Sequence, residues 1–191
     1  MIFGIIENKI LGGFCQLKSK YETSGAVLKR IYQFVHKAYQ YEMGCYLPLG
    51  IGLSGPINFP HGTAGIFISG SAKIGRNCTI YQQVTIGSNA LIDSKKFGSP
   101  LIGDNCLIGA GAKIIGRIVI GDNCRIGANC VITENVPENS TVVLGKPIII
   151  NKDIQINKLY SKSSSGWSYM EDGIIKTELD PEIIRKLDMN S

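Results

Sequence analysis

Isoleucine recurs every six residues through the middle of the chain, and this spacing constrains the fold more than any other feature of the sequence. The repeat comprises Ile68, Ile74, Ile80, Ile86, Ile102, Ile108, Ile114, Ile120, Ile126 and Ile132. Because only 30 of the 191 residues are Ile, chance does not account for the pattern. A six-residue step turns an α-helix by about 240°, which would scatter the side chains around it. In a strand the same step keeps them on one face.

The residues around each repeated Ile indicate short strands broken by tight turns. The residue two positions earlier should share its face and is small or β-branched, as in Cys78, Val84, Ala112, Ile118, Cys124 and Cys130. The turns GRN, GDN, GAG and GAN consist largely of Gly, Asn and Asp, which tolerate positive φ. The pattern predicts a mainly β solenoid of parallel rungs around a dry interior lined by Ile.

Other segments surround this solenoid. We expect an N-terminal helical segment over residues 1–45, with a helix at 24–42 capped by Ser24, and we expect the repeat domain over 46–150. The helix should bury an apolar stripe made of Val27, Leu28, Ile31, Val35, Ala38 and Tyr39. The repeat is interrupted between Ile86 and Ile102, so a loop at 87–101 should leave the wall there.

The C-terminal tail, residues 151–191, follows the repeat. Its stretch SKSSSGW is typical of a linker. The following sequence LDPEIIRKLDM predicts a short helix, with Asp180 as the cap and Pro181 in the first position.

The composition narrows the class of protein. An apolar fraction of 44%, a charged fraction of 18% and a net charge of +5 exclude a disordered chain and do not indicate nucleic-acid binding. Glu7 and Lys9 interrupt the apolar start of the chain, so neither a membrane span nor a signal peptide is expected, and we predict a cytoplasmic protein. The six cysteines are expected to be reduced, because stacked rungs are about 4.8 Å apart, wider than the roughly 3.8 Å that disulfide Cβ atoms prefer.

Four motifs carry a resemblance to a known family. HGTAGIFI, YQQVTIG, IGAGAKIIG and ENVPENSTVVLGKP, together with the Ile repeat, resemble the left-handed β-helix acyltransferases of the hexapeptide-repeat family. The most similar branches are the serine acetyltransferases and the O-acetyltransferases of capsule, O-antigen and other sugars. The resemblance implies a left-handed parallel β-helix with three hexapeptides per coil. It also implies homotrimers that bind acetyl-CoA between neighbouring subunits.

His61 lies in the sequence PHGTAG, which is similar to the catalytic histidine motif of the family. Acetyl transfer to a hydroxyl requires a base that titrates near neutral pH, and imidazole meets this requirement. The position of the Asp that orients this histidine in serine acetyltransferases is Tyr46 here, so that partner is absent. His36 has no motif around it and is expected to be structural.

Family geometry also places other candidate site residues. If the loop replaces one hexapeptide step, Gln82, Ala110 and Ala128 line one corner of successive coils, and His61 lies about one coil earlier near the same edge. Cys78, Cys106 and Cys124 would then stack on one face.

The resemblance assigns acetyl-CoA contacts to Gly87, Ser88, Ala110 and Ala128. Arg125 and Lys146 would meet phosphates of CoA, or would belong to an ordinary solvated surface. Lys95 and Lys96 in the loop are expected to be solvated. No metal site is expected, because the zinc-binding relatives need three His ligands and only His61 lies in the coils.

The leading hypothesis from the sequence is an acetyl-CoA-dependent O-acetyltransferase that acetylates a sugar hydroxyl of a surface polysaccharide or its precursor, with His61 as general base. Serine O-acetyltransferase is the alternative enzyme. The short region before the coils, the missing Asp, the loop without His or Arg and the tail ending in Asn190 and Ser191 all favour the sugar. A non-catalytic β-helix that serves as a binding module is a further alternative.

Overall fold

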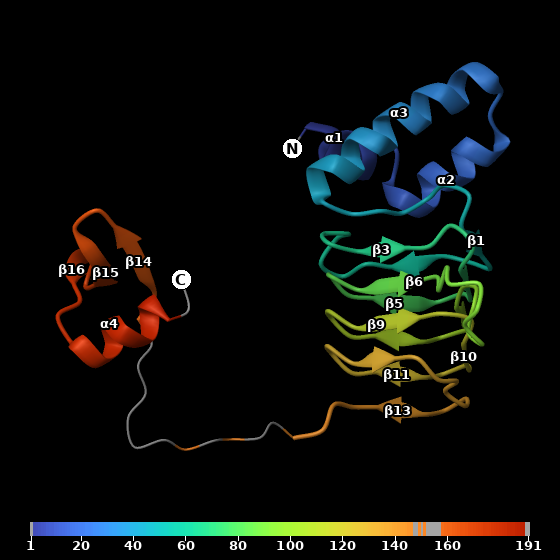
Figure 1. Ribbon diagram of the computed structural model, residues 1–191. Coiled ribbons are helices and arrows are strands. Elements are labelled where there is room, and N and C mark those ends of the chain that lie inside the picture. The colour runs from blue at the N-terminus through green and yellow to red at the C-terminus, as the bar shows by residue number, and fades with distance from the viewer. Residues whose placement is uncertain (1, 147–148, 150, 152–157, 190–191) are drawn as a thin grey trace. The chain divides into compact units, whose positions relative to one another are not determined.

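The computed structural model describes residues 2–146, 149, 151 and 158–189. The chain divides into two compact units, Met1–Lys146 and Pro147–Ser191. Figure 1 shows helices followed by a stack of short strands in the first unit, and a small sheet with a helix in the second. The predicted C-terminal tail, residues 151–191, lies partly outside the described residues.

Four helical segments open the first unit: α1 (Ile2–Ile5), the π-helix η1 (Ile6–Ile10), α2 (Gly13–Thr23) and α3 (Ala26–Met43). The prediction that Ser24 caps the long helix is wrong, because Gly25 is the N-cap of α3 and Ser24 ends α2. The hydroxyl of Ser24 instead donates to the carbonyl oxygen of Lys20, 2.6 Å away.

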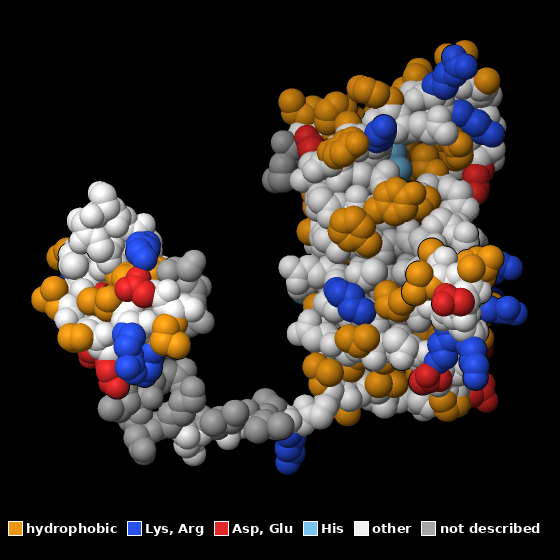
Figure 2. All heavy atoms as spheres, viewed as in Figure 1, with side chains coloured by type: hydrophobic (Ala, Val, Ile, Leu, Met, Phe, Trp, Pro, Cys, Tyr) orange, Lys and Arg blue, Asp and Glu red, His pale blue; other side chains and the backbone are white. Residues whose placement is uncertain are grey.

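The predicted apolar stripe of this helix is mostly not buried. Val27 is 74% exposed, and Leu28 and Ile31 are about half exposed, whereas His36 and Tyr39 are the buried residues of α3. Figure 2 shows hydrophobic side chains gathered on the surface of the N-terminal helices. The prediction failed because α3 contacts the rest of the unit along a face that includes a polar residue, His36.

His36 forms a buried pair with Glu7 beneath α3. Its Nδ1 lies 2.9 Å from Glu7 Oε2 and its Nε2 lies 2.6 Å from the carbonyl oxygen of Leu47. A carbonyl oxygen only accepts, so Nε2 carries a proton and donates it. Burial raises the pKa of the Glu7 carboxyl, although its contact with His36 opposes this. Both ring nitrogens are therefore used, and His36 is structural, as the sequence predicted.

The repeat region consists of three parallel sheets that the chain visits in rotation. The first sheet contains β1 (Gly52–Leu53), β4 (Lys73–Ile74), β7 (Leu101–Ile102) and β10 (Val119–Ile120). The second sheet contains β2 (Ile57–Asn58), β5 (Cys78–Ile80), β8 (Leu107–Ile108), β11 (Arg125–Ile126) and β13 (Thr141–Val142). The third sheet contains β3 (Phe67–Ile68), β6 (Thr85–Gly87), β9 (Lys113–Ile115) and β12 (Val131–Ile132). The predicted mainly β solenoid of parallel strands is present.

The repeated Ile residues form the core of this solenoid. All ten are buried, and so are the small residues two positions before them. The sheet register stacks identical positions, for example Ile74 on Ile102 and Ile80 on Ile108. Each coil therefore buries its Ile side chains against those of the next coil, which is the interior that the six-residue spacing predicts.

Asparagine forms a second stacked column at the turns between the first and second sheets. Asn77, Asn105, Asn123 and Asn139 all have φ between +56° and +58°. Their side-chain amides are linked from coil to coil over 3.2 to 3.3 Å. Asn fits here because it tolerates the left-handed conformation and both donates and accepts a hydrogen bond.

The six cysteines are all free thiols. Cys78, Cys106 and Cys124 stack in successive coils of the second sheet, as predicted, and each thiol donates to a backbone carbonyl of the next coil at 3.0 to 3.2 Å. They are compact core residues that also satisfy backbone acceptors.

The chain between β6 and β7, residues 88–100, interrupts the Ile repeat. It closes through a bridge between Asn89 and Gly98, with the two backbone hydrogen bonds at 2.8 and 2.9 Å. Lys96 is partly exposed, and its ammonium group pairs with Glu134 and donates to the carbonyl oxygen of Thr133. The loop is thereby tied to the last coils of the solenoid.

The second unit contains an antiparallel sheet of β14 (Tyr160–Ser163), β15 (Gly166–Glu171) and β16 (Ile174–Thr177), followed by α4 (Pro181–Asp188). The prediction of a linker at SKSSSGW is wrong, because these residues form β14 and the start of β15. The predicted helix is present, and the Asp180 carboxylate accepts from the backbone N–H of Glu182 and Ile183. No helix within the described residues is long and apolar enough to cross a membrane.

We predict that Ile114→Ala lowers the free energy of unfolding by about 2 to 5 kcal/mol, because it leaves a cavity between coils on both sides. Ile114 is fully buried in β9. The control is Ile92→Ala at a loop position that is 88% exposed, where a change within about 0.5 kcal/mol is expected. Urea denaturation measures both, and equal effects would contradict the assigned core.

We predict that Glu7 makes stability depend on pH. Because burial raises its pKa above the ordinary 4.5, the folded protein keeps a proton that the unfolded chain releases. The contribution of Glu7 is therefore complete below pH 4.5 and is lost as pH rises through the raised pKa. The unfolding free energy of wild type minus that of Glu7→Gln, measured by urea denaturation in steps upward from pH 4.5, should decrease as the pH rises. A difference that increases with pH would refute it.

Candidate active site

The turns that follow the strands of the second sheet form one edge of the solenoid, which we call the His61 edge. The register pairs Ile57 with Cys78 and Thr79 with Leu107. The same register places His61, Gln82, Ala110 and Ala128 at equivalent positions in successive coils. Backbone hydrogen bonds of 3.0 and 2.9 Å join Gly111 to Gln82 and Asn129 to Ala110 along this edge. The structure thus brings together four residues that the sequence analysis placed at one corner.

His61 is exposed and held in a defined orientation. Its Nδ1 lies 2.8 Å from Gln82 Oε1, and the ring of Tyr81 packs edge-on at 5.2 Å between centroids. An amide oxygen only accepts, so Nδ1 is the protonated nitrogen and Nε2 keeps its lone pair. Within the described residues, no carboxylate forms an ion pair with His61. The chemistry available at this turn is general base catalysis through Nε2.

Helix α3 supports the turn that carries His61. Thr63, two residues after His61, is buried and its hydroxyl lies 2.7 Å from the hydroxyl of Tyr39. Burial raises the pKa of the Tyr39 hydroxyl, which favours its protonated form. Gly65 also donates its N–H to the carbonyl oxygen of Met43, 3.3 Å away. The N-terminal helices therefore position the turn that presents His61. The sequence did not predict this support, because the residues that make these contacts are far apart in the chain.

Ala110 and Ala128 offer unused backbone donors. Within residues 2–146, neither N–H donates a hydrogen bond. Both residues lie outside the strands and are at least partly exposed, so a ligand could accept from them. Coils are about 4.8 Å apart, so these two donors are spaced along the edge at that interval. Arg125 in β11 is exposed and points outward two residues before the turn at 127–129, and Lys146 is exposed beyond β13.

Gly87 and Ser88 do not lie on the His61 edge. Gly87 ends β6 in the third sheet and Ser88 follows it, at the next corner and at the base of the loop. The hydroxyl of Ser88 lies 2.5 Å from that of Ser69 and 2.6 Å from that of Ser99. Gly87 packs closely on the next coil, since a Cβ there would lie 2.9 Å from Ile115 Cδ1. The structure separates these two predicted cofactor residues from the other four.

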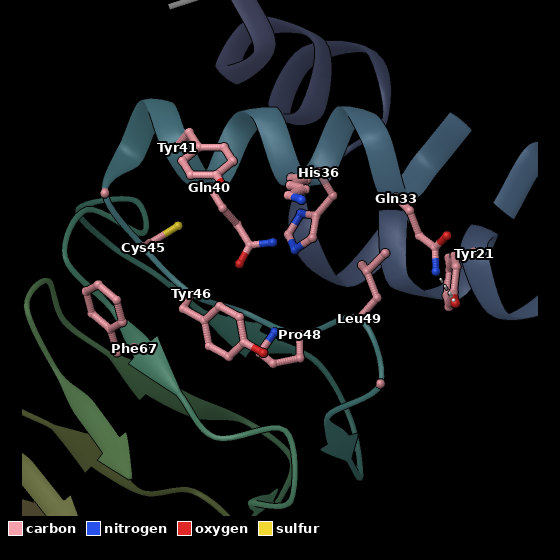
Figure 3. A pocket seen from close by; sticks show the side chains of 13 residues that line it. Tyr21, Gln33, His36, Gln40, Tyr41, Cys45, Tyr46, Pro48, Leu49 and Phe67 are labelled. Carbon is pink, nitrogen blue, oxygen red and sulfur yellow. Dashed lines mark hydrogen bonds between the residues drawn. The ribbon is translucent and has the colours of Figure 1, made fainter. Parts of the chain in front are cut away.

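A pocket of about 580 Å³ lies between α3 and the chain that leads into the first coil. Figure 3 shows His36, Gln40, Tyr46, Pro48 and Leu49 around it. None of the predicted site residues lines this pocket, so it is distinct from the His61 edge. No group of three or more metal-ligating side chains is positioned to hold an ion in the part of the chain that the structure describes.

Comparison with known proteins supports the resemblance drawn from the motifs. The family model Bacterial transferase hexapeptide (six repeats) matches residues 99–134. A serine acetyltransferase of Staphylococcus aureus strain Mu50 is 44% identical over 97 residues, which are 50% of this chain and 45% of that protein. The chain thus spans about half the length of the curated relatives it matches.

The chain is also similar to solved structures of serine acetyltransferases. The chain is similar to serine acetyltransferase isoform 3 of Entamoeba histolytica, in complex with cysteine, with a TM-score of 0.57 and 32% identity over 73% of this chain and 48% of that one. It is also similar to the Neisseria gonorrhoeae serine acetyltransferase in complex with serine, with a TM-score of 0.55 and 29% identity over 70% and 53% of the two chains. The resemblance to hexapeptide-repeat acyltransferases is confirmed.

The preference for a sugar acceptor is contradicted by these comparisons. The relatives and the structural neighbours are serine acetyltransferases, so the findings favour the alternative over a sugar hydroxyl or polysaccharide biosynthesis. The features that favoured a sugar were the short region before the coils, the missing Asp, the loop without His or Arg and the tail. The family model matches residues 99–134, which lie within the coils, where the motifs had already resembled this branch.

We predict that Tyr39→Phe lowers the free energy of unfolding by about 1 to 2 kcal/mol, because it removes the hydrogen bond to the buried Thr63 hydroxyl. Tyr41→Phe is the matched control, since Tyr41 lies on the same helix and is 78% exposed. The control should change stability by less than about 0.5 kcal/mol. If urea denaturation gave both variants the same stability, the support assigned to Tyr39 would be absent.

Proposed function

We propose that the protein is an acetyl-CoA-dependent O-acetyltransferase whose acceptor is the hydroxyl group of L-serine. The observation that carries this proposal is the exposed imidazole of His61, with Nε2 free, at the start of a row of small residues with unused backbone donors. The prediction of an acyltransferase agrees with the names of the relatives, and those names supply the acceptor.

The reaction requires one base and no further cofactor. Nε2 of His61 takes the proton of the serine hydroxyl while the oxygen attacks the thioester carbonyl of acetyl-CoA. The tetrahedral intermediate collapses, the bond from carbon to sulfur breaks, and the CoA thiolate receives the proton from His61. The products are O-acetylserine and CoA, and the imidazole returns to its starting tautomer.

Acetyl-CoA would bind along the His61 edge. The N–H groups of Ala110 and Ala128 are free to donate to amide carbonyls of the pantetheine arm, and the cations of Arg125 and Lys146 are suited to its phosphates. Gly87 and Ser88 lie at another corner, so they would contribute from a neighbouring copy. This arrangement accords with a left-handed β-helix and a homotrimer with acetyl-CoA between subunits, as the family resemblance implies.

The experiment is release of the CoA thiol from acetyl-CoA by the full chain, with L-serine, L-threonine, free sugars and polysaccharides as separate acceptors. We expect L-serine to give the highest kcat/KM. A higher value with a sugar would overturn the acceptor. No release with any acceptor would overturn the enzyme activity and favour a binding module.

We predict that His61→Ala lowers kcat with L-serine about 10²- to 10⁴-fold, the range that a positioned general base contributes. The thermal midpoint should change little because His61 is exposed. Lys73→Ala, at an exposed position on the first sheet, is the control and should keep wild-type kcat. An active His61→Ala variant would assign the base to another residue.

A further inference from the structure

An exposed histidine acts efficiently as a base only if one ring nitrogen is deprotonated and aimed at the acceptor. A free imidazole exists as two tautomers and rotates about its side-chain bonds. Serine acetyltransferases, which this chain resembles, use an Asp for this purpose, and that position is Tyr46 in this chain. Some other group must therefore orient His61.

Gln82 is the side chain that contacts the ring. The distance between His61 Nδ1 and Gln82 Oε1 is 2.8 Å, which is hydrogen-bond distance. Since Oε1 cannot donate, the contact requires the proton on Nδ1 and leaves Nε2 as the acceptor. Tyr81, which precedes Gln82, packs its ring against the imidazole at an interplanar angle of 80° and restricts rotation of the imidazole.

The backbone of Gln82 is held from both sides. Its carbonyl oxygen accepts from Gly111 in the next coil at 3.0 Å. The neighbouring N–H groups are also engaged, since Tyr81 donates to Ile108 and Gln83 donates to Ala64, both at 3.0 Å. The register places Gln82 one coil beyond His61, so its side chain spans a single coil spacing. A rigid wall thus presents the amide to the imidazole.

We propose that Gln82 is the positioning residue of His61 and occupies the role of the family's Asp. This inference rests on the proposed function. An amide selects the tautomer and direction of the ring, as a carboxylate does, but it carries no negative charge to stabilise the imidazolium that forms during transfer. Gln82 therefore contributes orientation without charge stabilisation, which distinguishes this site from a histidine and carboxylate dyad.

The test compares three variants of the full chain. Gln82→Leu removes the acceptor, Gln82→Glu keeps an oxygen acceptor and adds a charge, and Gln83→Asn is the matched control, because Gln83 is exposed and has a φ of +61°, which Asn tolerates. The readouts are kcat and KM with L-serine, the pH profile of kcat/KM, and the ¹⁵N signals of the imidazole. The chain has only 2 His residues, so the His61→Ala variant assigns the signals.

We expect Gln82→Leu to lower kcat about 10- to 100-fold with little change in KM, and to shift the His61 signals away from the form protonated at Nδ1. Gln82→Glu should retain that form and most of the activity. Its acid limb should move to higher pH, because the carboxylate favours the protonated imidazole. Gln83→Asn should match wild type in every readout.

The inference is overturned if Gln82→Leu keeps both the wild-type ¹⁵N signals and kcat within a factor of about two. It is also overturned if Gln83→Asn has the same effect as Gln82→Leu, since the loss would then be structural. If wild type acetylates no acceptor, the proposed function fails separately. The ¹⁵N comparison of wild type and Gln82→Leu still decides whether Gln82 orients the ring.

Discussion

The parallel register between successive coils is the constraint on which the rest of the first unit depends. Backbone hydrogen bonds stack each strand directly on its equivalent one coil away, so residues of one kind form columns along the solenoid. The Ile column excludes water, the Asn column satisfies the turns, and the Cys column satisfies backbone carbonyls. A shift of one residue in any of these strands would turn its repeated Ile side chain out of the interior and break the column to which that Ile belongs.

The same register builds the candidate active site. A turn that carries a reactive side chain in one coil lies beside the equivalent turn of the next coil, where a partner can reach it. His61 and Gln82 meet in this way, and Ala110 and Ala128 continue the row with unused backbone donors. The N-terminal helices add what the coils lack, because Tyr39 holds the turn through the buried hydroxyl of Thr63.

The identity of the acceptor depends on features of the sequence that differ in how much they reveal. The motifs within the coils indicated the acyltransferase family, and the comparisons agree with that inference. The argument for a sugar depended instead on what surrounds the coils and on the missing Asp. The 2.8 Å contact with Gln82 weakens the second of these arguments, because an amide from the next coil provides the hydrogen-bond acceptor that the Asp would have supplied.

The sequence by itself determined the solenoid and its interior, because the six-residue period keeps ten Ile side chains on the inward face of successive strands. The corner that holds His61 followed from the resemblance to the hexapeptide-repeat family. The sequence also located the helix capped by Asp180, a local hydrogen-bonding pattern. The tertiary structure alone decided which face of α3 is buried, the pairing of Glu7 with His36 and the sheet of the second unit. It also decided the placement of Gly87 and Ser88 at a different corner and the contact between His61 and Gln82. These features depend on side chains from distant segments meeting at hydrogen-bond distance, and hydrophobic periodicity carries no information about such contacts.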